Sequence, residues 1–199
     1  DFFGRDARKT LAPLYVSLFL NTAPFMIYFG EEVGEKGMDE EGFSGRDGRT
    51  TIFDWWSVAS IRRLRKLIAS GKYRTSSVSE LVENGLMKEE AELFLRFTEA
   101  IRFAAEDCSI RQGTTYDLCY CNMSSDGFDK NRHFVFLRDY EEHTLLIAAN
   151  FSNREAVMKL VIPEHAFEWM GIPKTEVLHP GKVIEVKVQP MDGAIVTLI

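Results

Sequence analysis

Two adjacent carboxylates follow a short apolar run near the start of the chain. The run covers residues 25–29, begins after a proline and ends at Gly30, and it leads directly into Glu31 and Glu32. Its short length and its boundaries predict a buried strand rather than a helix. In α/β barrels, active sites are assembled at the carboxyl ends of such strands. We therefore expect Glu31, Glu32 and Tyr28 to shape the mouth of a binding cleft, with a structural role at the loop or in the core as the alternative.

The elements that would position these residues are mainly helical in the first half of the chain. Apolar residues recur at the three-and-four spacing of a helix face over 11–19, 58–68 and 94–104, and Asp6 is the expected N-cap of the first helix. A helix, a break and a buried strand follow one another as in an α/β unit with a parallel sheet. Residues 30–54 form a long polar loop interrupted by glycines, and loops of this length usually carry function or are disordered.

From about residue 114 the pattern changes to the alternation typical of strands. Short segments with turn residues between them predict an antiparallel sandwich. The segments are 114–122, 132–138, 144–151, 156–162, 174–179, 182–188 and 193–199. The chain is therefore predicted to contain two unlike parts, a helical or α/β part over 1–107 and an all-β part over 108–199.

Four stretches, in the same order along the chain, resemble the α-amylase family of glycoside hydrolases. Residues 23–34 resemble its last barrel strand, where an apolar run leads into Tyr-Gly-Glu-Glu, and residues 49–56 resemble its Arg-Thr-Pro-Met segment before a Trp. Residues 133–140 and 145–152 resemble a hairpin of its C-terminal sandwich. This sequence departs from the family at Thr51, where proline is usual, and at Phe29, where a second tyrosine is usual.

The resemblance implies an α+β fragment, in which the last βα part of a (β/α)8 barrel is followed by an antiparallel β-sandwich. It also implies the C-terminal portion of a retaining α-glucan-cleaving glycosidase whose catalytic carboxylates lie on earlier strands, upstream of this chain. Glu31 and Glu32 cannot replace them. A retaining pair stands about 5 Å apart across one glycosidic bond, whereas adjacent residues of a strand point in different directions. The chain alone is therefore expected to be inactive.

The resemblance makes Tyr28, Glu31, Glu32 and Arg49 the expected substrate-binding residues. For Arg49, an ion pair with a barrel carboxylate is the alternative to a sugar contact. Trp55 and Trp56 are expected to pack against the barrel rather than to stack on sugar. The substrate would be an α-glucan or oligosaccharide, bound by the full-length parent protein.

Two other functions fit the same sequence. One is a non-catalytic amylase-like partner subunit of a transporter. The other is a carbohydrate-binding β-sandwich module, which would need exposed aromatic residues on one face. The spacing of the four aromatic residues in the β part predicts no such platform; they are Tyr116, Tyr120, Tyr140 and Trp169.

Composition narrows the remaining classes. The formal charge of −6 argues against nucleic acid, and no apolar run reaches the roughly 18 residues of a membrane span. The four histidines lack ligand spacing, so no metal or other cofactor is expected. The three cysteines are expected to act as small core residues, with a single disulfide as the alternative. A front half cut from its barrel would expose apolar faces, which predicts self-association.

Overall fold

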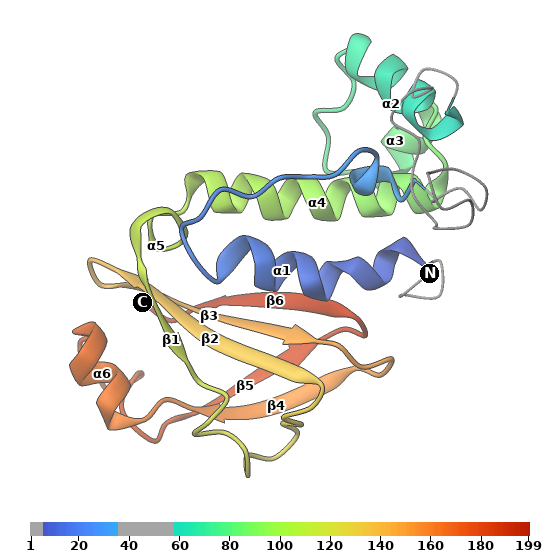
Figure 1. The fold of residues 1–199 in the computed structure, drawn as a ribbon. Helices are drawn as coiled ribbons and strands as arrows, with labels where there is room; N and C mark the ends of the chain where they lie inside the picture. The colour runs from blue at the N-terminus through green and yellow to red at the C-terminus, as the bar shows by residue number, and fades with distance from the viewer. Residues whose placement is uncertain (1–5, 36–57) are drawn as a thin grey trace, which may run out of the picture. The chain divides into compact units, whose positions relative to one another are not determined.

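The computed structural model describes residues 6–35 and 58–199, and these residues mix helices with antiparallel sheets (Figure 1). They group into two compact units. One unit contains the described residues up to 8 and from 26 to 99, and the other contains residues 9–25 and 100–199. The mixture of helix and sheet predicted from the sequence is confirmed. The predicted division into 1–107 and 108–199 stays a prediction.

The first unit is built from short helices around a small apolar core. It contains the 3-10 turn η2 (Glu31–Val33), the helices α2 (Ala59–Ala69) and α3 (Val78–Glu83), and the first turns of α4 (Lys88–Glu106). The predicted spacing of α2 is confirmed for Ile61 and Leu64, but Ile68 is half exposed and Leu67 is fully buried in its place. Nine buried residues make up the core: Val33, Ile61, Leu64, Leu67, Leu81, Leu86, Ala91, Phe94 and Leu95.

The second unit contains every strand of the described residues. A four-stranded antiparallel sheet has the order β1-β2-β3-β6, and β4 pairs with β5 in a two-stranded sheet. The strands are β1 (Thr114–Asp117), β2 (His133–Tyr140), β3 (His143–Asn150), β4 (Ala156–Val161), β5 (Val183–Val188) and β6 (Asp192–Thr197). The helices are α1 (Leu11–Phe19), entered through the turn η1 (Ala7–Thr10), then α5 (Cys108–Gln112) and α6 (Glu164–Met170).

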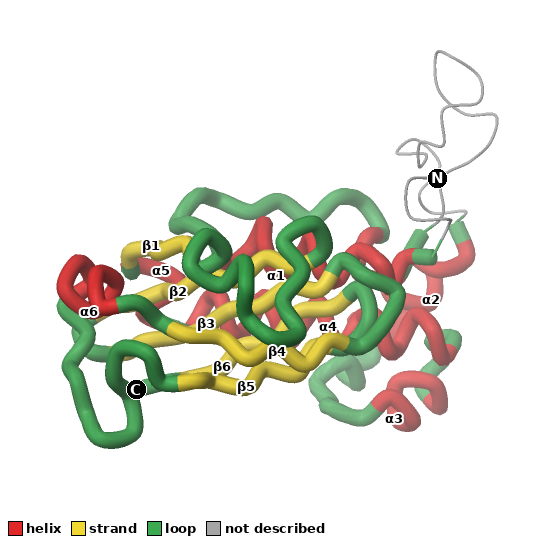
Figure 2. The backbone as a smooth tube through the Cα atoms, turned by 90° about the horizontal axis from the view of Figure 1, so that it is seen from below, coloured by secondary structure: helices red, strands yellow, loops and turns green. Residues whose placement is uncertain are grey.

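The larger sheet is covered on both faces. Side chains of one face, such as Leu137 and Leu146, share a core with Met158 and Val186 of the smaller sheet. Helix α1 lies along the other face (Figures 1 and 2). Successive residues of a strand point to opposite faces, so a strand covered on both sides should be buried along its whole length. Strand β3 meets this expectation, since seven of its eight residues are buried.

The predicted buried strand over residues 25–29 is wrong. This segment has no regular secondary structure, and Met26 and Tyr28 are 83% and 52% exposed. A parallel strand needs hydrogen-bonding neighbours beside it, and no strand of the described residues belongs to the unit that contains residues 26–29. The apolar run therefore pairs with no strand of the described residues.

Smaller differences have local causes. Residues 174–179 form a tight turn instead of a strand, because the backbone and hydroxyl of Thr175 hydrogen-bond Leu178. Asp6 does not cap α1. Its carboxylate accepts from the backbone N–H of Arg8 at 3.2 Å and so begins η1, while Thr10 occupies the N-cap position of α1. None of the helices in the described ranges combines the length and the apolar character of a membrane span.

Candidate functional site

The loop that follows the apolar run is a compact turn held by its own backbone. Gly30 and Gly34 have φ angles of 74° and 66°, a region that favours glycine. The N–H of Glu35 donates to the carbonyl of Gly30 at 2.9 Å and closes the loop. Glycine is also required sterically, since a Cβ at Gly30 would lie 2.5 Å from the Cβ of Glu35. The sequence thus fixes the direction in which three carboxylates leave the loop.

The two predicted carboxylates of this loop behave differently. The side chain of Glu31 folds back and accepts from the backbone N–H of Tyr28 at 3.1 Å. Glu32 is half-buried, and burial raises the pKa of its carboxyl above the usual range, as does the neighbouring charge of Glu31, while a backbone hydrogen bond opposes the shift. A 3-10 turn separates consecutive side chains by about 120°. Glu31 and Glu32 therefore do not point to a common atom.

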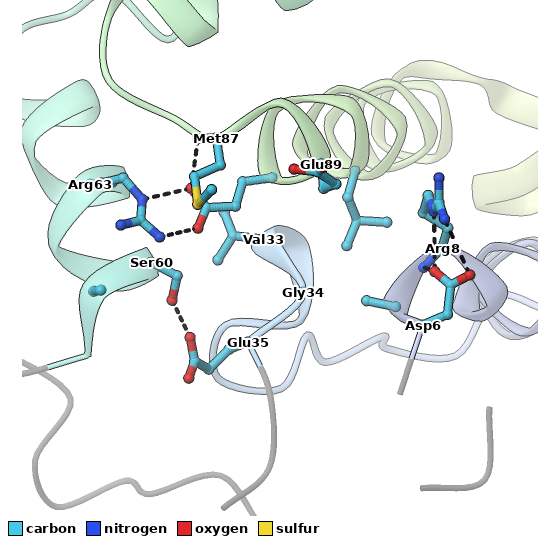
Figure 3. Close-up of a pocket in the computed structure, with 13 residues that line it drawn as sticks. Asp6, Arg8, Val33, Gly34, Glu35, Ser60, Arg63, Met87 and Glu89 are labelled. Carbon is cyan, nitrogen blue, oxygen red and sulfur yellow. Dashed lines mark hydrogen bonds and ion pairs between the residues drawn. The ribbon is translucent and has the colours of Figure 1, made fainter. Parts of the chain in front are cut away.

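Beside this loop, the first unit has a pocket of about 680 Å³ (Figure 3). Its wall combines apolar side chains with charged ones. The thirteen lining residues come from η1, the η2 loop, α2 and the start of α4: Asp6, Ala7, Arg8, Val33, Gly34, Glu35, Ala59, Ser60, Arg63, Met87, Glu89, Glu90 and Leu93. A concave surface of mixed character is the usual form of a small-molecule site.

The strongest electrostatic feature of the pocket is the pair between Arg63 and Glu90. The guanidinium is bidentate: its Nε donates to Oε2 at 2.8 Å, and Nη2 donates to Oε1. The backbone N–H of Met87 also donates to Glu90, at 3.0 Å. Burial alone would raise the pKa of Glu90, but the hydrogen bonds from Arg63 and Met87 outweigh it and hold this pKa below its usual range. The hydrogen bond that Arg63 donates to Glu90 raises the pKa of Arg63 in turn.

Two further carboxylates of the pocket are also engaged. Asp6 binds the guanidinium of Arg8, with Nε and Oδ1 at 3.1 Å, and Glu35 accepts a hydrogen bond from the hydroxyl of Ser60 (Figure 3). A general acid or base has to exchange its proton with the substrate. Three of the four carboxylates that line the pocket are occupied by cations or hydroxyls and are better suited to orienting a ligand; the fourth is Glu89. The geometry therefore supports binding at this pocket more than catalysis.

The structure separates the predicted site residues from the pocket. Tyr28 and Glu31 contact each other, Glu32 adjoins them, and none of the three lines the pocket. Arg49, Trp55 and Trp56 lie outside the described residues.

Sequence reasoning missed the pocket residues Glu35, Ser60, Arg63 and Glu90. Glu35 belongs to the same glycine-bounded loop as Glu31, and this shared loop was the available signal. Arg63 is one of several basic residues of α2, and its side chain binds Glu90, which is 27 positions away in the sequence. No local pattern predicts a contact of that range.

The cysteines of the second unit are free thiols, so the disulfide alternative is wrong. Burial raises the pKa of Cys119 to about 12 and also raises the pKa of Cys121. Both side chains pack against the core between the sheets.

The fold of this chain is similar to those of solved structures, although its sequence identity to them is low. The sequence matches no family model and no curated protein. Among solved structures, a variant of AmyP in complex with maltotriose is similar over 98% of this chain and 35% of its own chain, with 13% identity and a TM-score of 0.51. The described chain shares the fold of the part of the AmyP structure that it matches. The resemblance predicted from the sequence is thereby confirmed for the fold.

Other amylase-type structures are similar at lower TM-scores. The Nostoc punctiforme debranching enzyme, soaked with acarbose, shares 17% identity over 92% of this chain and 28% of its own, with a TM-score of 0.46. The isomaltulose synthase of Klebsiella sp. LX3 shares 13% identity over 98% of this chain and 38% of its own, with a TM-score of 0.48. The chain thus spans between about a quarter and two fifths of the length of these enzymes.

Proposed function

We propose that the chain is the C-terminal portion of a retaining α-glucan-cleaving glycosidase of the α-amylase type. The nucleophile and the acid/base carboxylate of such an enzyme would lie on barrel strands that this chain does not contain. The observation that carries the proposal is the fold similarity to the AmyP structure, which holds maltotriose and which this chain matches over nearly its whole length.

The unpaired apolar run over 25–29 supports the same proposal. The run belongs to no sheet of the described residues. It exposes three large apolar side chains, those of Met26, Ile27 and Tyr28. In a complete barrel this run would gain a strand on each side, which would satisfy its backbone groups and cover its side chains. In isolation it is a surface for association. We therefore expect the purified chain to form oligomers, and light scattering that showed a monomer at all concentrations would contradict this expectation.

We further propose that Tyr28, Glu31, Glu32 and Arg49 contact the glucan in the complete enzyme. The Glu31 carboxylate is held by the backbone N–H of Tyr28 at 3.1 Å, at the end of the exposed apolar run. Carboxylate oxygens accept hydrogen bonds from sugar hydroxyls. The pocket that contains Glu35 and Arg63 would add further donors and acceptors on the same unit.

Release of reducing ends from starch and from maltoheptaose tests the proposal. The chain alone should release none, whereas the full-length gene product should be active. Exchange of Glu31 and Glu32 for glutamine in that product should raise KM more than it lowers kcat, because these residues would bind substrate without taking part in the chemistry. The exposed helical residue Glu83, exchanged for glutamine, is the matched control.

Each other result would refute a part of the proposal. Hydrolysis by the chain alone would show that it contains a catalytic pair. Inactivity of the full-length product on both substrates would remove the glycosidase function and would favour the non-catalytic partner subunit.

A further inference from the structure

Four aromatic side chains of the second unit, far apart in the sequence, form one cluster at the edge of the larger sheet. Tyr116 lies on β1 and Tyr120 follows it, while His165 and Trp169 lie on α6, beside β1 (Figures 1 and 2). The ring of Tyr116 is at the centre, 6.2 Å from the Tyr120 ring and 5.9 Å from both the His165 and the Trp169 rings, centroid to centroid.

The cluster has a buried anchor and an exposed rim. Tyr116 is 8% exposed, whereas Trp169 and Tyr120 are 57% and 51% exposed, and His165 is also exposed. Single exposed aromatic residues are common, but a group of them fixed to one buried ring is a feature that a fold does not need for stability. The anchor limits the rotamers of the rim, so a ligand that binds there would lose little additional side-chain entropy on the protein side.

Polar atoms are interleaved with these rings. The Tyr116 hydroxyl hydrogen-bonds the Tyr120 hydroxyl and, at 3.1 Å, the Nδ1 of His165. These bonds hold the Tyr120 hydroxyl and the imidazole in fixed directions. The Nε2 of His165 has no hydrogen bond to any residue of the described ranges, so it is available as a donor or an acceptor. The surface therefore offers flat aromatic faces with hydrogen-bonding atoms at their edges.

This combination matches a pyranose ring. One face of a hexose carries mainly C–H groups, which pack on the negative face of an aromatic ring, and its rim carries hydroxyls that both donate and accept. A protein interface needs about 800 Å² per partner, far more than two exposed side chains provide. Asp117 next to Tyr116, and Glu164 and Glu168 on α6, would repel a phosphate-bearing ligand. We propose that Trp169, Tyr120 and His165 form a binding surface for the pyranose units of a glucan chain.

This surface corrects one interpretation of the sequence. The spacing of the four aromatic residues in the β part predicted no platform, but three of them, Tyr116, Tyr120 and Trp169, are brought together by the packing of α6 against β1. The proposal does not rest on the glycosidase function, because it needs only the described second unit.

Isothermal titration of the purified chain with maltoheptaose, and separately with cellohexaose, tests the surface and distinguishes α-linked from β-linked glucans. Trp169→Ala should weaken binding about tenfold, the equivalent of the loss of one stacked face. Tyr120→Phe keeps the ring and removes the hydroxyl, so it should weaken binding about threefold. Phe151→Ala removes an exposed aromatic ring elsewhere in the same unit and should leave binding unchanged.

Circular dichroism of each variant checks that it is folded. Binding of either oligosaccharide that depends on Trp169 and Tyr120 but not on Phe151 would support the surface. No binding of either oligosaccharide up to about 10 mM, which would reveal Kd values in the millimolar range, would overturn it. Binding that survives both Trp169→Ala and Tyr120→Phe would overturn it as well, because the sugar would then bind elsewhere. Hydrolysis is not measured in these titrations, so the glycosidase proposal can fail independently.

Discussion

Arg138 is a cation buried in the second unit, and its replacement should reduce the stability of that unit strongly. Only 1% of the residue is exposed. Its guanidinium donates to three carbonyl oxygens, those of Ser109 at 3.1 Å, Ile110 at 2.8 Å and Leu20 at 3.3 Å, and also to the hydroxyl of Thr115. Two of these carbonyls belong to α5, and Leu20 is the C-cap of α1. A single side chain therefore fastens the ends of two helices to the sheet.

The expected loss follows from what Arg138→Met would leave behind. Each buried carbonyl left without a donor costs about 1–3 kcal/mol. The carbonyl of Ile110 would lose the guanidinium as its donor, whereas those of Ser109 and Leu20 would still accept from the N–H of Gly113 and the hydroxyl of Thr115. Burial of the guanidinium costs desolvation free energy and lowers the pKa of Arg138 in the folded protein. Removal of the cation recovers this desolvation cost, which offsets part of the loss. We expect the free energy of unfolding to fall by about 2 kcal/mol, within the range for disrupted buried networks. For Arg138→Lys we expect a fall of about 1 kcal/mol, because a lysine keeps the charge but lacks the planar fork.

Guanidinium chloride unfolding, followed by far-ultraviolet circular dichroism, measures both variants. Arg102→Met is the matched control, since Arg102 is an exposed arginine of α4 within the same unit, and it should change stability by less than about 0.5 kcal/mol. If Arg138→Met were as stable as the control, the carbonyls would be hydrogen-bonded to water or to other donors. The conclusion that Arg138 holds the ends of the two helices to the sheet would then be refuted.

Three further predictions concern single residues. The pKa of Glu90 is lowered in the folded protein, so its pair with Arg63 stabilises the first unit above pH ~4.5, and this stabilisation is lost as the pH falls through the folded pKa. The melting temperatures of wild type and Glu90→Gln should therefore differ at pH 7 and converge at pH 3. An equal difference in melting temperature at both pH values would contradict this. The hairpin turn between β2 and β3 holds Glu142 at a φ of 69°, so Glu142→Gly should raise the free energy of unfolding by about 0.5–1 kcal/mol. The control Glu99→Gly, inside α4, should lower it by a similar amount. A lower melting temperature for Glu142→Gly would refute the turn argument. The pKa of Cys119 is raised to about 12 in the folded protein, so the free energy of unfolding should decline above pH ~9, where the unfolded thiol ionises. Iodoacetamide at pH ~9 should label Cys119 in the unfolded but not in the folded protein. Equal labelling of the two, measured by mass spectrometry, would contradict the burial of Cys119.

The sequence allowed correct prediction of those elements whose signal is local. Helices α1, α2 and α4 follow from apolar residues three and four positions apart, and β2 to β6 coincide with short segments between turn residues that were predicted as strands. The run over 25–29 has the same local signal as a buried strand, yet its state depends on neighbours that local pattern cannot supply. The candidate pocket was not predictable for the same reason. Its main ion pair joins α2 to α4, and the aromatic cluster joins β1 to a helix 49 positions away.

The layer that α1 adds to the sheet has a consequence for how the second unit folds. The backbone N–H of Ala12 donates to the carbonyl of Met191 at 3.1 Å, and the ring of Tyr15 packs where Gly193 of β6 leaves room, since a Cβ there would lie 2.2 Å from that ring. Ala12 and Met191, 179 positions apart in the sequence, must therefore meet before the layer can close. Such non-local contacts slow folding, and during synthesis α1 would remain without its partner strand until β6 emerged. Throughout that interval its apolar face would be open to other chains, so a ribosome-proximal chaperone should have its longest opportunity to bind at residues 11–19.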